Sequence, residues 1–175
     1  MTTHKSIQIL KKSNSYRNVI LDLGYGEIKN SGFLSDFDLD SIVEIIEELT
    51  KVINGTLDGY SWGQDQIMID SEKVSSYCFN ELDNIALPDV PTQDLLNLMI
   101  EVKNFKTEYE NPVVLNNIIS QAFNQIKSNP QSYKKWSHLI YYEVIINNIT
   151  VALQLELEDF NLSASQFVNQ LKIDI

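Results

Sequence analysis

Hydrophobic residues follow a helical period in three stretches of this chain. From Leu39 to Ile53 they recur at steps of three and four, which predicts an amphipathic helix. Acidic residues crowd the start of this helix, where the helix dipole favours anions, and they also occupy the face opposite the apolar stripe. Asn54-Gly55 favours the left-handed backbone conformation that ends a helix, so the sequence predicts both the helix and its end.

Three further helices are predicted, two from an apolar stripe with its caps and one from a capping box. Thr92 can cap a helix that carries apolar residues from Leu95 to Phe105. The next helix opens at Asn111-Pro112, because a proline in the first turn loses no hydrogen bond, and it ends at Asn129-Pro130. The tetrad 163–166 (Ser-Ala-Ser-Gln) forms a capping box for a short helix over about residues 164–172.

Alternation of apolar and polar positions predicts strands between these helices. Ser71-Glu72 is interpreted as a two-residue turn that pairs Ile69 with Val74. The strands predicted in the first half of the chain are residues 7–9, 17–23, 60–63, 66–70 and 73–79.

The clearest strand pattern lies between residues 140 and 157. If Asn147-Asn148 forms a two-residue turn, every facing pair on one side is apolar, which is the register that a buried face requires. The predicted pairs are Ile146 with Ile149, Val144 with Val151, Tyr142 with Leu153 and Ile140 with Leu155.

The order of these elements indicates the fold class. It contains hairpins rather than regular β-α-β alternation, which predicts an α+β fold with amphipathic helices packed against a mostly antiparallel sheet. A length of 175 residues is that of one domain, so we predict a single cooperative unit over residues 1–175. Residues 111–112 are the candidate for a sub-domain boundary, because the charge balance changes there.

The distribution of charge narrows the possible partners. The chain has 24 acids and 13 bases, a formal charge of -11, and residues 36–101 hold 15 of the acids against Lys51 and Lys73. We expect no nucleic-acid partner, because phosphate contacts need Lys and Arg. A localised negative field instead steers a basic partner and accelerates its association.

The reactive residue types form no catalytic or metal motif. Residues 36–47 carry acids at the spacing of a calcium loop, but Ser41 stands where the loop needs glycine, so we interpret the segment as a helix N-terminus. Cys78 lies in a strand pattern and is interpreted as a core residue. Phosphate-binding loops, zinc spacings and nucleophile elbows are absent from the sequence. We therefore expect no cofactor, no metal and no enzymatic activity.

The expected compartment is the cytoplasm. No apolar run approaches the ~18 residues of a membrane span, and the first six residues are polar, so we expect no membrane partner. A single cysteine permits no internal disulfide, which is typical of proteins from a reducing compartment.

Tyr60-Ser-Trp62-Gly63 places two aromatic side chains within the acidic segment. Tyrosine and tryptophan are the residues most enriched at binding hot spots. The alternative is that Trp62 packs in the core beneath the helix, because most tryptophans are largely buried. Both aromatics share one strand face, so one can anchor the core while its edge remains accessible.

Four short motifs follow one another in residues 58–110. They are Tyr60-Ser-Trp62-Gly63, the polar hairpin through 67–79, the segment 91–98 (PTQDLLNL) and Lys103-Asn104-Phe105. In these motifs the chain resembles a group of small bacterial immunity proteins, the antidotes to polymorphic and contact-dependent growth-inhibition toxins. Val102 stands where such proteins often carry a second tryptophan.

The resemblance implies a protein that binds the C-terminal domain of a cognate toxin, often a cationic nuclease, and blocks its active site or substrate groove. The alternative is a non-catalytic adaptor without a toxin partner. The predicted contact residues combine the acids of the segment with its two aromatics: Asp36, Asp38, Asp40, Glu44, Glu47, Glu48, Asp58, Tyr60, Trp62, Asp65 and Glu72.

Overall fold

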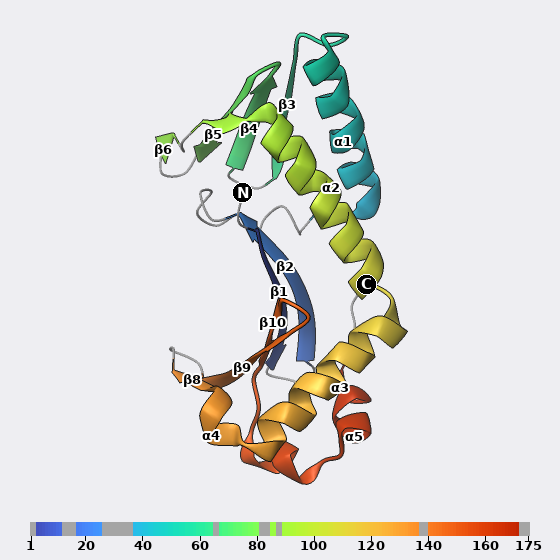
Figure 1. The fold of residues 1–175 in the computed structure, drawn as a ribbon, viewed down its shortest axis with the longest axis vertical. Helices are drawn as coiled ribbons and strands as arrows, with labels where there is room; N and C mark the ends of the chain where they lie inside the picture. The colour runs from blue at the N-terminus through green and yellow to red at the C-terminus, as the bar shows by residue number, and fades with distance from the viewer. Residues whose placement is uncertain are drawn as a thin grey trace. The chain divides into compact units, whose positions relative to one another are not determined.

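The protein has an α+β fold with two mostly antiparallel sheets, as predicted (Figure 1). The computed structural model describes residues 3–11, 17–25, 37–64, 67–80, 85–86, 89–136 and 140–171. The chain divides into two compact units. Unit 1 comprises Met1–Thr3 and Leu23–Thr107, and unit 2 comprises His4–Asp22 and Glu108–Ile175.

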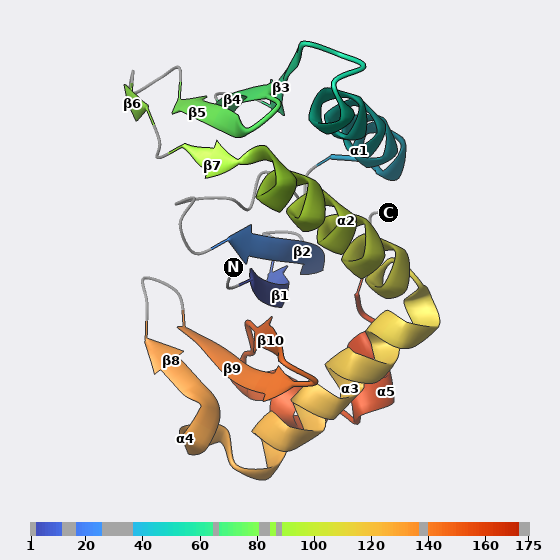
Figure 2. The same cartoon turned by 45° about the horizontal axis from the view of Figure 1, so that its top comes forward.

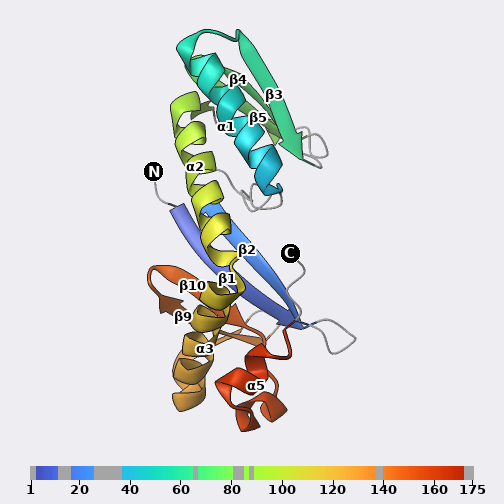
Figure 3. The same cartoon turned by 90° about the vertical axis from the view of Figure 1, so that its right-hand side faces the viewer.

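Unit 1 contains a β-sheet and two helices. The strands are β3 (Gly59–Gln64), β4 (Ile67–Glu72), β5 (Ser75–Asn80) and β6 (Ile85–Ala86), adjacent in that order, with β7 (Val90–Pro91) also paired to β5. The helices are α1 (Leu39–Asn54) and α2 (Thr92–Tyr109), which run side by side in Figures 1 and 3. Helix α1 contacts β3 and β4. Strands β6 and β7 are too short for the periodicity of the sequence to predict.

Helix α1 has the boundaries and the buried face that the sequence predicts. The Asp38 carboxylate caps it by accepting from the Ser41 amide at 2.7 Å, and Gly55 ends it with a φ of 80°. Asp38 is thus a helix cap, in agreement with the interpretation of this segment as a helix N-terminus. The buried residues of α1 are Ile42, Ile45, Leu49 and Val52.

The turn between β4 and β5 differs from the prediction by two residues. Ile69 lies opposite Cys78 instead of Val74, and the turn is Lys73-Val74 instead of Ser71-Glu72. The observed register places Ile69 and Cys78 together on the buried face, and it leaves Val74 79% exposed at the turn. The buried face includes two serines, so the positions of apolar residues alone do not indicate this turn.

A chain of hydrogen bonds joins four buried side chains in the core of unit 1. The indole Nε1 of Trp62 donates to the Ser71 Oγ at 3.0 Å, and the Ser76 Oγ lies 3.0 Å from both the Ser71 Oγ and the Thr92 Oγ1. The Thr92 hydroxyl donates to the backbone carbonyl of Glu72 at 2.5 Å. The Ser71 hydroxyl oxygen accepts from both the Trp62 indole and the Ser76 hydroxyl, so all four buried polar side chains have a partner inside the protein.

Thr92 therefore has a different role from the predicted one. Helix α2 does begin at Thr92, but the hydroxyl bonds to β4 and β5 and does not cap the helix. The amide of Thr92 also donates to the Val74 carbonyl at 3.1 Å. The start of α2 is thus attached to the β4–β5 hairpin.

Unit 2 contains a second sheet, in the order β2-β1-β10-β9-β8. Its strands are β1 (Thr3–Lys11), β2 (Arg17–Tyr25), β8 (Lys134–Trp136), β9 (Ile140–Ile146) and β10 (Ile149–Leu153). The first strand pairs in parallel with β10, from Lys5 opposite Ile149 to Ile9 opposite Leu153. This pairing joins the N-terminal strands to the C-terminal half of the chain.

The β9–β10 hairpin confirms three of the four predicted pairs. Asn147 and Asn148 both have positive φ, 51° and 62°, as a two-residue turn of this hand requires. The fourth pair, Ile140 with Leu155, is wrong because β10 ends at Leu153. After Leu153 the chain remains bonded to β1, where the Gln154 amide donates to the Ile9 carbonyl at 3.0 Å.

The helices of unit 2 are α3 (Pro112–Ser128), α4 (Pro130–Tyr133), a 3-10 helix (Leu157–Asn161) and α5 (Ala164–Val168). Helix α3 has the predicted Asn111 cap and contacts β9, β10 and α5 (Figure 2). The predicted capping box holds α5, which is shorter than expected because it ends at Val168. Phe123 of α3 stacks on Phe167 of α5, with ring centroids 4.5 Å apart.

Candidate protein-binding surface

The net charge of the chain belongs entirely to unit 1. Residues 23–107 hold 16 acids and 5 bases, whereas unit 2 holds 8 of each. The charge asymmetry read from the sequence therefore coincides with a structural division. The division falls at residues 107–108, near the candidate boundary, but β1 and most of β2 lie in unit 2, which the sequence does not indicate. The single cooperative unit remains a prediction.

The outer face of α1 carries the densest acidic patch of the predicted set. Asp40, Glu44 and Glu47 are exposed and follow one another at steps of four and three, so they share the face opposite the buried stripe. No hydrogen bond or ion pair from the described part of the chain reaches these three carboxylates. We call the face formed by Asp40, Glu44, Glu47 and Glu48 the α1 acidic face.

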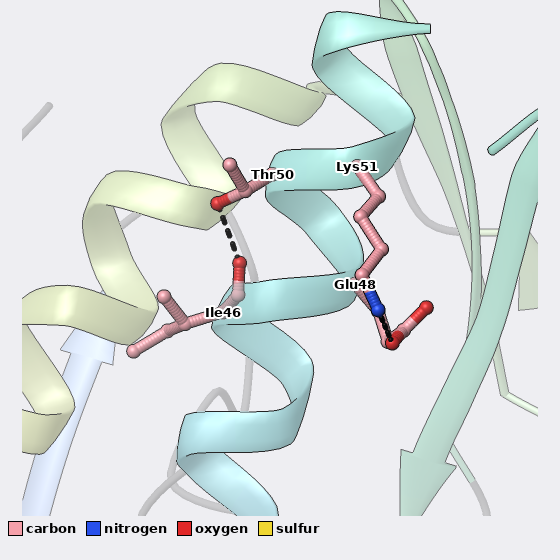
Figure 4. A network of polar contacts seen from close by, with 4 residues as sticks. All are labelled: Ile46, Glu48, Thr50 and Lys51. Carbon is pink, nitrogen blue, oxygen red and sulfur yellow. Dashed lines mark hydrogen bonds and ion pairs between the residues drawn. The ribbon is translucent and has the colours of Figure 1, made fainter. Parts of the chain in front are cut away.

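One base lies beside the α1 acidic face. Lys51 forms an ion pair with Glu48, with Nζ and Oε1 2.6 Å apart (Figure 4). This hydrogen bond, and then the charges of Glu48, Glu47 and Glu44, raise the pKa of Lys51 above its ordinary value. The lysine is therefore charged at neutral pH and offsets one carboxylate, so the face remains negative.

Tyr60 joins the α1 acidic face from the adjacent strand. Burial raises the pKa of the Tyr60 phenol, and the charges of Glu44 and Glu48 raise it further. Both causes keep the phenol neutral at physiological pH, where it can donate a hydrogen bond. A half-buried tyrosine beside exposed carboxylates is the combination that the sequence predicted for a contact surface.

The structure places the remaining predicted contact residues in different environments. Asp58 and Glu72 are exposed, at the start of β3 and the end of β4. Trp62 is 5% exposed and donates to Ser71, so it packs in the core, in agreement with the alternative for this residue, and it is wrong as a predicted contact residue. Asp36 and Asp65 lie outside the described residues.

The outer face of the sheet in unit 1 carries exposed residues that are not among the predicted contact residues. Asp70 and Tyr77 lie directly opposite each other on β4 and β5, and both are exposed. Phe79 follows Tyr77 on the same face and is 38% exposed. The alternation of 75–80 could have placed Tyr77 and Phe79 on one face, but only the register shows that Asp70 joins them.

Cys78 is buried, as predicted, and burial followed by the charge of Asp89 raises the pKa of its thiol to about 11. Among the residues with described positions, no three His, Cys, Asp or Glu side chains are placed to hold a metal ion. In the same residues, no helix is long and apolar enough to cross a membrane.

Comparison of the chain with protein families, with curated proteins and with solved structures finds no match.

Proposed function

We propose that this chain is an immunity protein that binds and neutralises a basic, nuclease-type toxin domain in the cytoplasm. The observation that supports the proposal most strongly is the segregation of charge, because unit 1 has a formal charge of -11 and unit 2 is neutral. Such a field accelerates capture of a cationic protein and competes for the surface that the toxin uses to hold phosphates.

The composition of the α1 acidic face supports a binding role over a solubilising one. Asp40 with Glu44, and Glu44 with Glu48, are like charges four residues apart, and each such pair destabilises a helix by about 0.2–0.5 kcal/mol. A face selected for stability would alternate acids with bases. A face selected to bind a cation retains this repulsion, which the partner relieves when it binds.

A growth assay tests the proposal. The gene that neighbours this one in its native genome is expressed alone and together with the chain in a bacterial host. We expect the neighbouring product to stop growth and the chain to restore it. Glu44→Lys should weaken the rescue, because it places a base at the centre of the α1 acidic face.

The matched control is Glu158→Lys, which makes the same change in net charge at an exposed glutamate of unit 2. It should leave the rescue intact. A neighbouring product that does not affect growth, or equal rescue by Glu44→Lys and the unchanged chain, contradicts the proposal. The first of these outcomes would favour an adaptor without a toxin partner.

A further inference from the structure

The outer face of the β3–β4–β5 sheet combines an oriented carboxylate with exposed aromatic rings. Across the three strands, Ser61 lies opposite Asp70, and Asp70 lies opposite Tyr77. The Ser61 hydroxyl donates to the Asp70 Oδ1 at 2.6 Å. One carboxylate oxygen is thus held toward β3, while Tyr77, 45% exposed, flanks the same carboxylate on β5.

The next row of this face is apolar and flat. Gly63, Met68 and Phe79 lie opposite one another across the three strands. Glycine is required at position 63, because a Cβ there would lie 2.1 Å from the Ile67 carbonyl oxygen. Since β3 presents only Gly59, Ser61 and Gly63 to this side, nothing bulky on β3 shields the aromatic residues of β5.

We propose that this face binds an arginine side chain of the basic partner, which rests on the proposed function. A guanidinium is planar and weakly hydrated, so it can stack on the Tyr77 ring while it donates to the Asp70 carboxylate. Its three-carbon stem then lies over Met68 and Phe79. Lysine is a more strongly hydrated point charge and gains less from the same ring and carboxylate.

The negative charge of unit 1 favours a cation as the group that binds to this face of the sheet. Asp70 and Glu72 both point to this side, and the strands β3, β4 and β5 contain no basic residue. An apolar partner would leave the Asp70 carboxylate desolvated without a counter-charge, which is unfavourable. An arginine-bearing segment satisfies the carboxylate and covers the aromatic rings together.

Calorimetric titration of the full chain with hexa-arginine and with hexa-lysine tests this site, because the two peptides carry equal charge. We expect hexa-arginine to bind several-fold more tightly. Tyr77→Ala and Asp70→Asn should each weaken hexa-arginine binding roughly 2–5-fold and remove the preference for arginine. Tyr77→Phe retains the ring and should retain the preference.

Two controls separate this site from the α1 acidic face. Trp136→Ala removes an aromatic of unit 2 that is 75% exposed, and it should change nothing. Glu44→Gln with Glu47→Gln should weaken both peptides equally. Equal affinity for the two peptides, or a preference that survives Tyr77→Ala, overturns the arginine site and leaves the proposed function standing. If Glu44→Gln with Glu47→Gln does not weaken peptide binding while the preference for hexa-arginine persists, the result counts against the proposed function alone.

Discussion

Replacing Ser71 by alanine tests whether the buried chain of hydrogen bonds stabilises unit 1. The Trp62 N–H would lose its acceptor at a site where the indole is 5% exposed and Ser71 is 1% exposed. Leaving one buried donor unsatisfied costs about 1–3 kcal/mol. We therefore expect Ser71→Ala to lower the free energy of unfolding by that amount, which moves the urea midpoint down by about 1 M at a typical denaturant slope.

The assay is urea unfolding followed by far-UV circular dichroism and by tryptophan fluorescence. Trp136 is 75% exposed, so a Trp136→Phe background leaves Trp62 as the sole fluorescent reporter of unit 1. The matched control is Ser61→Ala, which removes the exposed hydrogen bond to Asp70 from the outer face of the same sheet. Water can replace the lost partner there, so stability should change by less than about 0.5 kcal/mol.

A double-mutant cycle, followed by far-UV circular dichroism because it removes Trp62, identifies the interaction. Trp62→Phe removes the indole donor, so in that background Ser71→Ala should destabilise the protein by about 1 kcal/mol less than it does alone. An equal effect of Ser71→Ala in both backgrounds, or an effect below about 0.5 kcal/mol beside Trp62, would refute the reasoning.

Four further predictions concern other features of unit 1. Gly63→Ala should destabilise unit 1 by about 1–3 kcal/mol, because the new Cβ meets backbone atoms. Gly59→Ala should cost less, because the nearest atom to its new Cβ is 3.3 Å away. Urea unfolding compares the two variants, and equal effects would count against the close approach at Gly63. Glu44→Gln should stabilise unit 1 by a few tenths of a kcal/mol, because it removes like-charge repulsion on α1, and it should lower the pKa of Tyr60, which the Glu44 charge raises. An NMR titration of labelled tyrosine measures this pKa. An unchanged pKa would show that the two groups do not interact. The Cys78 thiol is buried and has a pKa of about 11, so it should react with a disulfide reagent only as fast as unit 1 opens. Rapid labelling of the native protein would contradict its core position. The hydrogen bonds from Ser41 lower the pKa of Asp38, so the contribution of Asp38 to stability is present above its ordinary pKa and is lost as the pH falls through the lowered pKa. Asp38→Asn keeps the helix cap and should make stability less dependent on pH below about pH 4. Identical acid unfolding profiles of the two proteins would refute this prediction.

Local patterns in the sequence predict the local structure well. The stripe and stop of α1, the Asn111 cap of α3 and the turn at Asn147-Asn148 each depend on residues within one or two turns of chain, so the sequence alone indicates them. The same holds for the acidic residues of α1, because their helical spacing decides which face they share.

Features that depend on distant residues could not be predicted. The parallel pairing of β1 with β10 joins Ile7 to Val151, and no local pattern indicates such a partner. The sequence pattern misplaces the turn after β4 because the buried face there contains two serines: Ser71 accepts a hydrogen bond from Trp62, and Ser76 donates one to Ser71. The bond to Ser71 satisfies the indole N–H of Trp62 at its buried position.

The account depends on the negative surface of unit 1 capturing a positively charged protein. The most direct measurement is the association rate of the chain with the purified, catalytically inactive product of the neighbouring gene, at ionic strengths of about 0.01 M and 1 M. Screening lengths there are about 30 Å and 3 Å, so we predict that the rate falls at least tenfold. Glu44→Lys should lower the rate at low salt, and Glu158→Lys should lower it less. A rate that does not change with salt, or that the two variants reduce equally, would contradict the account.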